Sequence, residues 1–301
     1  MPAIKSTIRP TTFASYRTHV QHQIVPRIGG LQLFRLSASH LNALYAELLN
    51  NGRANRRGAL SPTTVKRVHA TLHRALRDAV RWGYVSKNVA DSADPPRKAE
   101  LLEMRTWALD DLRRFLKAVR RDELYELWLL YAVTGMRRGE ALGLRWCDVD
   151  FTRQQIAIRQ AVIAIGSLIY LSRPKTAKGR RVIALDETTT LALRRLVRRR
   201  KTHGDNLLFS NGDNRPLDPT WVTKRFVALV EYHGLPLIRL HDLRHTHATL
   251  ALQAGVHPKI VSERLGHSTV SLTLDVYSHA IPHMQKDAAE QIASLVFGSG
   301  S

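Results

Sequence analysis

A proline-containing stretch after the first third of the chain divides the sequence into two parts with different patterns. This stretch, DSADPPRKAELLEMR at residues 91–105, has paired prolines and mixed charges but no apolar periodicity, which is typical of a link between domains. A chain of 301 residues is long enough for two domains that each bury a core. We therefore predict domains at residues 1–92 and 107–297, a linker at residues 93–106 and a flexible tail at residues 298–301.

Capping residues and apolar spacing in the first domain predict helices only. Thr11 or Thr12 is expected to cap a first helix that runs towards Ile24 and is ended by Pro26 and Gly29-Gly30. Ser39 is expected to cap a second helix. The Ser-Pro pair at residues 61–62 places a cap residue before a first-turn proline, which predicts the start of a third helix. The apolar residues that follow each start recur at helical spacing.

The third helix also carries a row of cations: Lys66, Arg67, Arg74, Arg77 and Arg81. Such a row is usually a solvated helix face. In a chain as basic as this one, it is also a candidate for contact with phosphate groups.

The second domain begins with helical patterns and changes period near residue 148. Alternating and β-branched residues predict short strands at residues 156–163, 168–171 and 181–185. We expect a small antiparallel sheet whose hairpin, SRPKTAKGR at residues 172–180, presents Lys175 near its tip. Further helices are expected at residues 187–201, 221–233, 242–254, 258–265, 272–277 and 284–297. The predicted fold class is α+β, mainly α, with an all-helical domain followed by a mixed domain.

The net charge indicates an anionic partner. The chain has 46 Lys and Arg against 25 Asp and Glu, a formal charge of +21, and phosphate contacts by such a protein release condensed counterions. A membrane partner is not predicted, because there is no basic amphipathic terminus or lipidation signal. The most apolar run, residues 161–171, is shorter than the roughly 20 residues of a membrane helix.

Cysteine usage and the first residues favour a cytoplasmic protein. Cys147 is the single cysteine, so no intramolecular disulfide can form. The N-terminal residues lack the apolar core of a signal peptide.

Three segments of the second domain carry residues suited to phosphoryl transfer. In HDLRHTHATL at residues 241–250, His241 and Arg244 are three residues apart and share a helix face. This pairs a titratable imidazole with a guanidinium whose planar fork suits phosphate. Arg137 lies two residues after Gly135 in TGMRRGE, and His267 and Tyr277 follow downstream. The structural alternatives are a surface salt bridge for an arginine and half-buried packing for a lone tyrosine.

A zinc site is not predicted from His241 and His245, although they are four residues apart. The zinc motif of that spacing needs a glutamate directly after the first histidine, and here Asp242 and then Leu243-Arg244 follow. An arginine within the cluster would also repel a dication. The sequence also lacks the glycine-rich loop with a lysine that binds nucleotide phosphates. We therefore predict no cofactor and no metal.

Four motifs in order resemble the tyrosine recombinases of the phage-integrase type. They are TGMRRGEALGLRWCDVD from residue 134, PKTAKGRR from residue 174, HDLRHTHATL from residue 241 and LGHSTVSLTLDVYSH from residue 265. The resemblance covers the second domain, and the helical first domain looks like the family's SAM-like core-binding domain. Many phage integrases carry a further N-terminal module that binds arm sites, and the sequence leaves open whether this protein is naturally minimal or truncated.

The resemblance implies six catalytic residues: Arg137, Lys175, His241, Arg244, His267 and Tyr277. The two arginines would hold the non-bridging oxygens, and Tyr277 would be the nucleophile. Lys175 would protonate the 5′-oxygen, His241 would act as acid and base, and His267 would donate to the phosphate. Glu140 resembles the acidic residue that orients the pocket, with a plain surface glutamate as the alternative. Four other histidines are interpreted as packing or surface residues: His245, His247, His279 and His283.

The function that the resemblance implies is site-specific DNA recombination through a 3′-phosphotyrosyl intermediate. It further implies a homotetramer on two double-stranded DNA sites, a Holliday-junction intermediate and a C-terminal helix, here residues 284–297, that docks on a neighbouring protomer. DNA-bending accessory proteins are further candidate partners, and a bacterial or phage-encoded protein is expected. Two alternatives stay open, a DNA-binding regulator that performs no strand transfer and a relaxing enzyme of the type IB topoisomerase kind.

Overall fold

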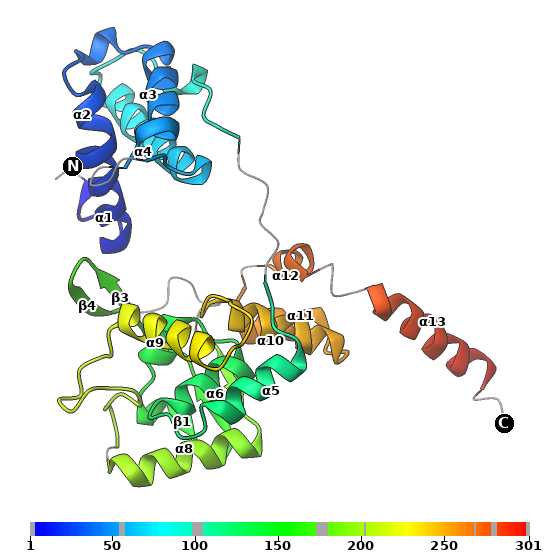
Figure 1. Ribbon diagram of the computed structural model, residues 1–301. Coiled ribbons are helices and arrows are strands. Elements are labelled where there is room, and N and C mark those ends of the chain that lie inside the picture. The colour runs from blue at the N-terminus through cyan, green and yellow to red at the C-terminus, as the bar shows by residue number, and fades with distance from the viewer. Residues whose placement is uncertain are drawn as a thin grey trace. The chain divides into compact units, whose positions relative to one another are not determined.

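The computed structural model describes residues 4–53, 58–97, 105–172, 180–201, 203–267, 269–277 and 282–298 (Figure 1). The chain divides into two compact units, Met1–Leu102 and Glu103–Ser301. Within the described ranges, no helix combines the length and the apolar character that crossing a bilayer requires.

The first unit is helical, as predicted. Its elements are α1 (Pro10–Thr18), the π-helical segment η2 (His19–Ile24), α2 (Val25–Ile28), the 3₁₀ turn η3 (Leu33–Arg35), α3 (Ala38–Asn51), α4 (Pro62–Arg81) and the 3₁₀ turn η4 (Val89–Ser92). α3 and α4 lie side by side (Figure 1). Their contact buries one apolar stripe from each helix, formed by Leu41, Leu44, Leu48, Val65, Val68 and Leu72. Ser61 caps α4 through its side chain, which accepts a hydrogen bond from the backbone of Thr64, as the Ser-Pro pair predicts.

Of the two stops predicted for the first helix, Gly29-Gly30 is confirmed and Pro26 is wrong, because the chain stays helical through Ile28 and Gly29 is the C-cap. Proline lacks the N–H that would donate to the carbonyl of His22 in an α-helix. The π-helical segment precedes this position. The Arg27 guanidinium donates instead to the carbonyls of His22, at 3.1 Å, and Gln23, at 3.2 Å.

The predicted caps of the first two helices are also displaced. α1 begins at Pro10, with Arg9 rather than a threonine at the cap position. α3 is capped by Ser37 rather than by Ser39. In the first stretch Pro10 is the first helical residue, so the cap position falls on Arg9, which makes no side-chain cap hydrogen bond. In the second, Ser37 and Ser39 are both suitable caps, so the local pattern alone does not select between them.

The second unit contains nine helices and five strands among its described residues. Helices α5 (Leu109–Ala118), α6 (Tyr125–Thr134) and α7 (Arg138–Leu142) come first, followed by the 3₁₀ turn η5 (Trp146–Asp148). The strands are β1 (Val149–Asp150), β2 (Gln155–Ala157), β3 (Ala161–Ile165), β4 (Leu168–Ser172) and β5 (Val182–Ala184). The later helices are α8 (Glu187–Arg200), α9 (Pro219–Tyr232), α10 (Asp242–Gln253), α11 (Pro258–Leu265), α12 (Val270–Tyr277) and α13 (Pro282–Phe297).

The core of the second unit surrounds α6, whose residues are almost all buried, as its nearly continuous apolar sequence predicts. An aromatic cluster joins four separate segments here, with Trp107 and Phe115 against Phe226 and Trp128. The same helix contacts α10 and α8. These contacts of α6 therefore fix the position at which the next turn of the chain begins.

The strand content is confirmed as small and antiparallel, but the predicted hairpin is wrong. β4 pairs with β3, with Tyr170 opposite Ile163, while β5 pairs with β2, with Ile183 opposite Ile156. The two pairings belong to different sheets, one ordered β1-β2-β5 and one β3-β4. The β3-β4 turn has Gly166 at φ +61° followed by Ser167, a two-residue hairpin signal that the sequence already contains. Lys175 therefore belongs to the connection between β4 and β5, and residues 173–179 lie outside the described part.

Candidate active site

The turn after α6 brings the first predicted arginine into position. Gly135 ends α6 with φ +61°, a left-handed conformation that L-residues other than glycine adopt at a cost. A Cβ at this position would lie 2.6 Å from a methyl carbon of Leu265 and 2.8 Å from the His247 ring. Both the conformation and the space therefore require glycine here. The turn places Arg137 at the cap position of α7.

Arg137 is held by Glu140 and by a main-chain carbonyl. Its backbone N–H donates to Glu140 Oε2 at 3.0 Å, and its Nη1 donates to Oε1 at 2.8 Å. Its Nη2 donates to the carbonyl of Gly266 at 2.9 Å. The side chain remains 43% exposed, so a phosphate can reach it. The adjacent Arg138 donates instead to Thr223 and Pro219 of α9.

Arg244 of α10 is buried and reaches the same turn from another direction. Its Nη1 donates to the carbonyl of Gly135 at 2.7 Å, and its Nη2 to the carbonyl of Leu265 at 2.8 Å. Arg137 and Arg244 thus hold consecutive carbonyls, those of Gly266 and Leu265. The two arginines are 107 positions apart in sequence and meet at the end of α11.

His267 follows this turn and is joined to α12. Its Nδ1 lies 2.8 Å from the hydroxyl of Thr273. Burial, and then the charges of Arg244 and Arg137, lower the pKa of His267 to about 4, so the ring is neutral near pH 7. If the Thr273 hydroxyl donates to Nδ1, the neutral ring carries its proton on Nε2 and can donate to a phosphate oxygen.

His241 precedes the first turn of α10, three residues before Arg244. Loss of surrounding water, and then the Arg244 charge, lower its pKa below 6.5. The ring of His245 lies one turn further on, with ring centroids 5.1 Å apart and nearly perpendicular planes. Burial and the neighbouring His241 lower the pKa of His245 to about 4. The sequence interpretation treated His245 as packing or surface, although its four-residue spacing from His241 placed both on one face.

Two of the six predicted residues cannot be placed by their side chains. Tyr277 is the last residue of α12, one helical turn after Thr273, but its side chain lies outside the described part. Lys175 lies wholly outside it. The structure brings together the other four, Arg137, His241, Arg244 and His267. Within the described ranges, no group of three or more His, Cys, Asp or Glu side chains is arranged to hold a metal ion.

Glu140 is the buried acidic partner of the site. Burial alone would raise its pKa, but hydrogen bonds from Arg181 and the charges of Arg181 and Arg137 lower the pKa below its usual value. Sequence reasoning missed Arg181. Its place beside Glu140 depends on a contact between residues 41 positions apart, which no local pattern reveals.

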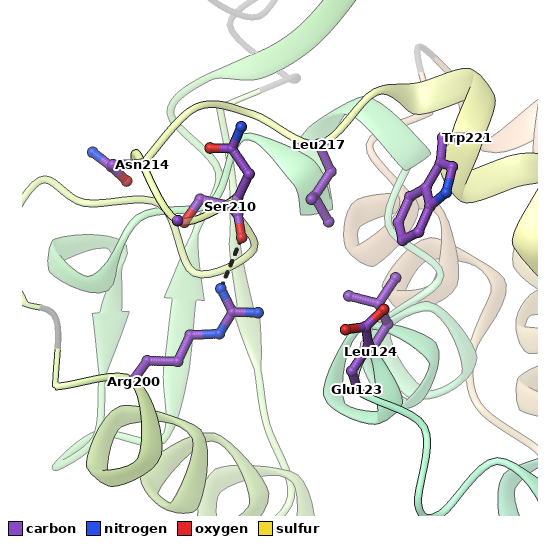
Figure 2. A pocket seen from close by; sticks show the side chains of 9 residues that line it. Glu123, Leu124, Arg200, Ser210, Asn214, Leu217 and Trp221 are labelled. Atoms are coloured by element: carbon purple, nitrogen blue, oxygen red, sulfur yellow. Dashed lines mark hydrogen bonds between the residues drawn. The ribbon is translucent and has the colours of Figure 1, made fainter.

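A separate pocket of about 460 Å³ lies elsewhere on the second unit (Figure 2). Leu124 and Trp221 face Ser210 and Arg200 across it, and Arg200 Nη1 donates to the Ser210 carbonyl at 2.9 Å. Leu124 directly precedes α6, whereas the arginine site begins at the opposite end of that helix. None of the predicted catalytic residues lines this pocket, so it is distinct from the candidate active site.

Comparison with known proteins identifies the family. Residues 106–283 match the profile of the Phage integrase family. A XerC-like tyrosine recombinase of Caldanaerobacter subterraneus subsp. tengcongensis is 25% identical over 320 residues, covering 97% of this chain and 80% of that protein. The Tn1549 transposon integrase, solved with transposon right-end DNA, has a TM-score of 0.80 at 22% identity, covering 97% of this chain and 96% of that one. Lambda integrase, solved as a tetramer bound to a Holliday junction, has a TM-score of 0.64 at 17% identity, covering 89% of this chain and 75% of that one. Because the family profile covers more than half of the sequence, the chain belongs to the phage integrase family, the tyrosine-type site-specific DNA recombinases.

Proposed function

We propose that this recombinase breaks and rejoins DNA with Tyr277 as nucleophile and with Arg137 and Arg244 as the phosphate-binding groups. The observation that supports this most is the convergence of the two arginines on the carbonyls of Leu265 and Gly266, directly before His267. A surface salt bridge would not bring two distant guanidiniums to one turn. Guanidiniums keep their charge at every relevant pH and fit the non-bridging oxygens of a phosphodiester.

In the proposed reaction, the Tyr277 oxygen attacks the scissile phosphorus, and the bond to the 5′-oxygen breaks. A phenol has a pKa of about 10, so it must lose its proton as it attacks, and His241 is the proposed acceptor. Lys175 is the proposed donor to the departing 5′-oxygen. The neutral His267 donates to the phosphate as negative charge accumulates on it.

The product is a 3′-phosphotyrosyl bond and a free 5′-hydroxyl. A 5′-hydroxyl from the partner duplex then attacks the phosphotyrosine, which restores a phosphodiester and releases the tyrosine. One phosphoester bond forms for each that breaks, so no ATP is needed. No step requires a metal ion to activate the nucleophile.

The first unit is proposed as the core-binding domain, with the exposed cations of α4 contacting the DNA backbone. The tetramer that lambda integrase forms on a Holliday junction supports the same assembly for this chain. α13 is the proposed docking element, because its described apolar side chains are mostly exposed: Ile292, Leu295, Val296 and Phe297. We place the reaction in the cytoplasm, with DNA-bending accessory proteins as further partners.

The test is an SDS-resistant adduct assay on nicked suicide duplexes taken from the junction DNA of the element that encodes the protein. Wild type and Tyr277→Phe are compared with chelator present. An adduct with the wild type alone supports the proposal, and the labelled strand reports the 3′ polarity. Tight binding without an adduct would favour the regulator alternative, and an adduct that survives Tyr277→Phe would show that another residue is the nucleophile. Relaxation of supercoiled DNA without a requirement for two specific sites would favour the topoisomerase alternative.

A further inference from the structure

Arg181 is a buried arginine that connects three segments of the candidate active site. It directly precedes β5, and its side chain is 7% exposed. Its Nη1 and Nη2 donate to the two oxygens of Glu140 at 3.1 and 2.8 Å. Its Nε donates to the carbonyl of Arg264 at 2.6 Å. All three nitrogens of the guanidinium are therefore used within the protein.

Glu140 is shared between Arg181 and Arg137. Its Oε1 accepts from Arg137 Nη1 and its Oε2 from the Arg137 backbone N–H, while Arg181 donates to both oxygens. A buried carboxylate is stable as an anion only when its hydrogen-bonding positions are filled and its charge is compensated. Arg181 thus fixes the rotamer and the charge of the group that fixes Arg137.

The end of α11 shows a second and independent connection. Three consecutive carbonyls accept from three different arginines. The carbonyl of Arg264 binds Arg181, that of Leu265 binds Arg244, and that of Gly266 binds Arg137. The last carbonyls of a helix have no partner within the helix and carry its partial negative charge, so guanidiniums satisfy them well. The next residue in the chain is His267.

We propose that Arg181 is a positioning residue for strand transfer. It orients Arg137 through Glu140, and it anchors the turn from which His267 extends. It does not bind the phosphate itself, since its side chain is buried and its guanidinium is directed at Glu140 and the carbonyl of Arg264. This inference rests on the proposed function, because it assumes that Arg137 holds the scissile phosphate.

The test compares Arg181→Lys with the wild type in single-turnover adduct formation. Lysine keeps the charge but not the planar fork, so it cannot reproduce the three directed bonds. We expect the rate to fall about 10- to 100-fold on a normal phosphate, the size of effect that displacement of a phosphate-binding group produces.

A second substrate separates positioning from a loss of folding. A methylphosphonate at the scissile position removes one charged non-bridging oxygen, so it depends less on the orientation of Arg137. For Arg181→Lys relative to wild type, we expect a clearly smaller loss on the methylphosphonate than on the phosphate. A variant that is merely less folded loses the same factor on both substrates, so the ratio of the two losses is independent of the folded fraction.

The matched control is Arg145→Lys. Arg145 forms a similar fork on the buried carboxylate of Asp148, with Nε at 3.0 Å and Nη2 at 3.1 Å. Arg145→Lys should reduce stability without changing the ratio between the losses on the two substrates.

In an Arg137→Lys background, adding Arg181→Lys should reduce the rate of adduct formation by a much smaller factor than it does alone, because both substitutions act on one contact.

Equal losses on the two substrates, or full additivity with Arg137→Lys, would overturn the inference. If the wild type forms an adduct and Tyr277→Phe does not, while Arg181→Lys matches wild type, only this inference fails. If the wild type forms no adduct at all, the proposed function fails and this inference fails with it.

Discussion

Gly135→Ala should destabilise the second unit and impair catalysis, because Gly135 packs closely against Leu265 and His247 and its carbonyl binds Arg244. The substitution keeps the sequence length and charge and adds a single methyl group. That methyl would have to fit within 2.6 Å of Leu265 and 2.8 Å of His247, closer than non-bonded carbon atoms approach. It would also push against the turn whose carbonyl binds Arg244.

The expected cost has two parts. A left-handed alanine costs about 1–2 kcal/mol relative to glycine, and overpacking a buried contact costs about 1–3 kcal/mol. The sum is about 2–5 kcal/mol, against a total stability of about 5–15 kcal/mol for a typical domain. Displacement of Arg244 should in addition slow adduct formation by about 100-fold.

Gly234→Ala is the matched control. Gly234 has φ +60°, nearly the same as Gly135, but no atom lies within 4 Å of its added Cβ. It should therefore show the conformational cost alone, with adduct formation close to wild type. Urea unfolding of the full chain, followed by tryptophan fluorescence, measures the stability of both variants. This signal reports on the second unit, which contains four of the five tryptophans: Trp107, Trp128, Trp146 and Trp221. If the two variants lose the same stability, the packing argument is refuted. If Gly135→Ala forms the adduct as fast as Gly234→Ala, the link between this turn and Arg244 is refuted.

Three further predictions concern pH, DNA contact and assembly. Burial, with the charge of Arg264, lowers the pKa of His247 to about 4. Since the unfolded state takes up the proton first, the stability that neutral His247 contributes is complete above pH ~6.5 and is lost as the pH falls towards 4. His247→Phe should flatten the dependence of the urea midpoint on pH over this range, and an unchanged slope would contradict the assignment. Arg77→Ala should weaken DNA binding and reduce the slope of the logarithm of the binding constant against the logarithm of the salt concentration by about 1. The control is Arg113→Ala, whose guanidinium pairs with Asp110, and the same effect from it would show that α4 has no special role. Deletion of α13 should impair assembly on DNA before it impairs DNA binding, as measured by sedimentation and by gel shift; lost binding with unchanged self-association would count against the docking role.

Local patterns in the sequence located most helices. The stretches at residues 242–254 and 258–265 were predicted, and the structure has α10 at Asp242–Gln253 and α11 at Pro258–Leu265. Capping residues, apolar spacing and chain breaks all act within a few residues, so they can be read from one sequence. The error at Ser39 is local as well, since Ser37 and Ser39 compete for the cap position. Pro26 does not end the helix, because the Arg27 guanidinium donates to the carbonyl of His22 in place of the missing proline N–H.

Pairings between distant segments were not predictable in the same way. The run at residues 181–185 fits a strand, but nothing local shows that it pairs with β2 rather than with β4. The same holds for Glu140 and Arg181, whose contact arises only when that strand is placed in its sheet. Motif spacing indicated Arg137 and Arg244 as site residues, but not which groups would hold them.

The contacts at the end of α11 explain how the site is ordered before DNA arrives. Arg244 is fixed by two main-chain carbonyls, and Arg137 by one main-chain carbonyl and by Glu140. Each guanidinium has five N–H groups, more than the two that these carbonyls and Glu140 take from Arg137. The arginine can therefore keep its anchoring bonds while it binds a phosphate. Donors that are already oriented need no rearrangement as charge develops in the transition state. A change at the turn, such as Gly135→Ala, should for this reason reduce the rate of cleavage more than the affinity for DNA.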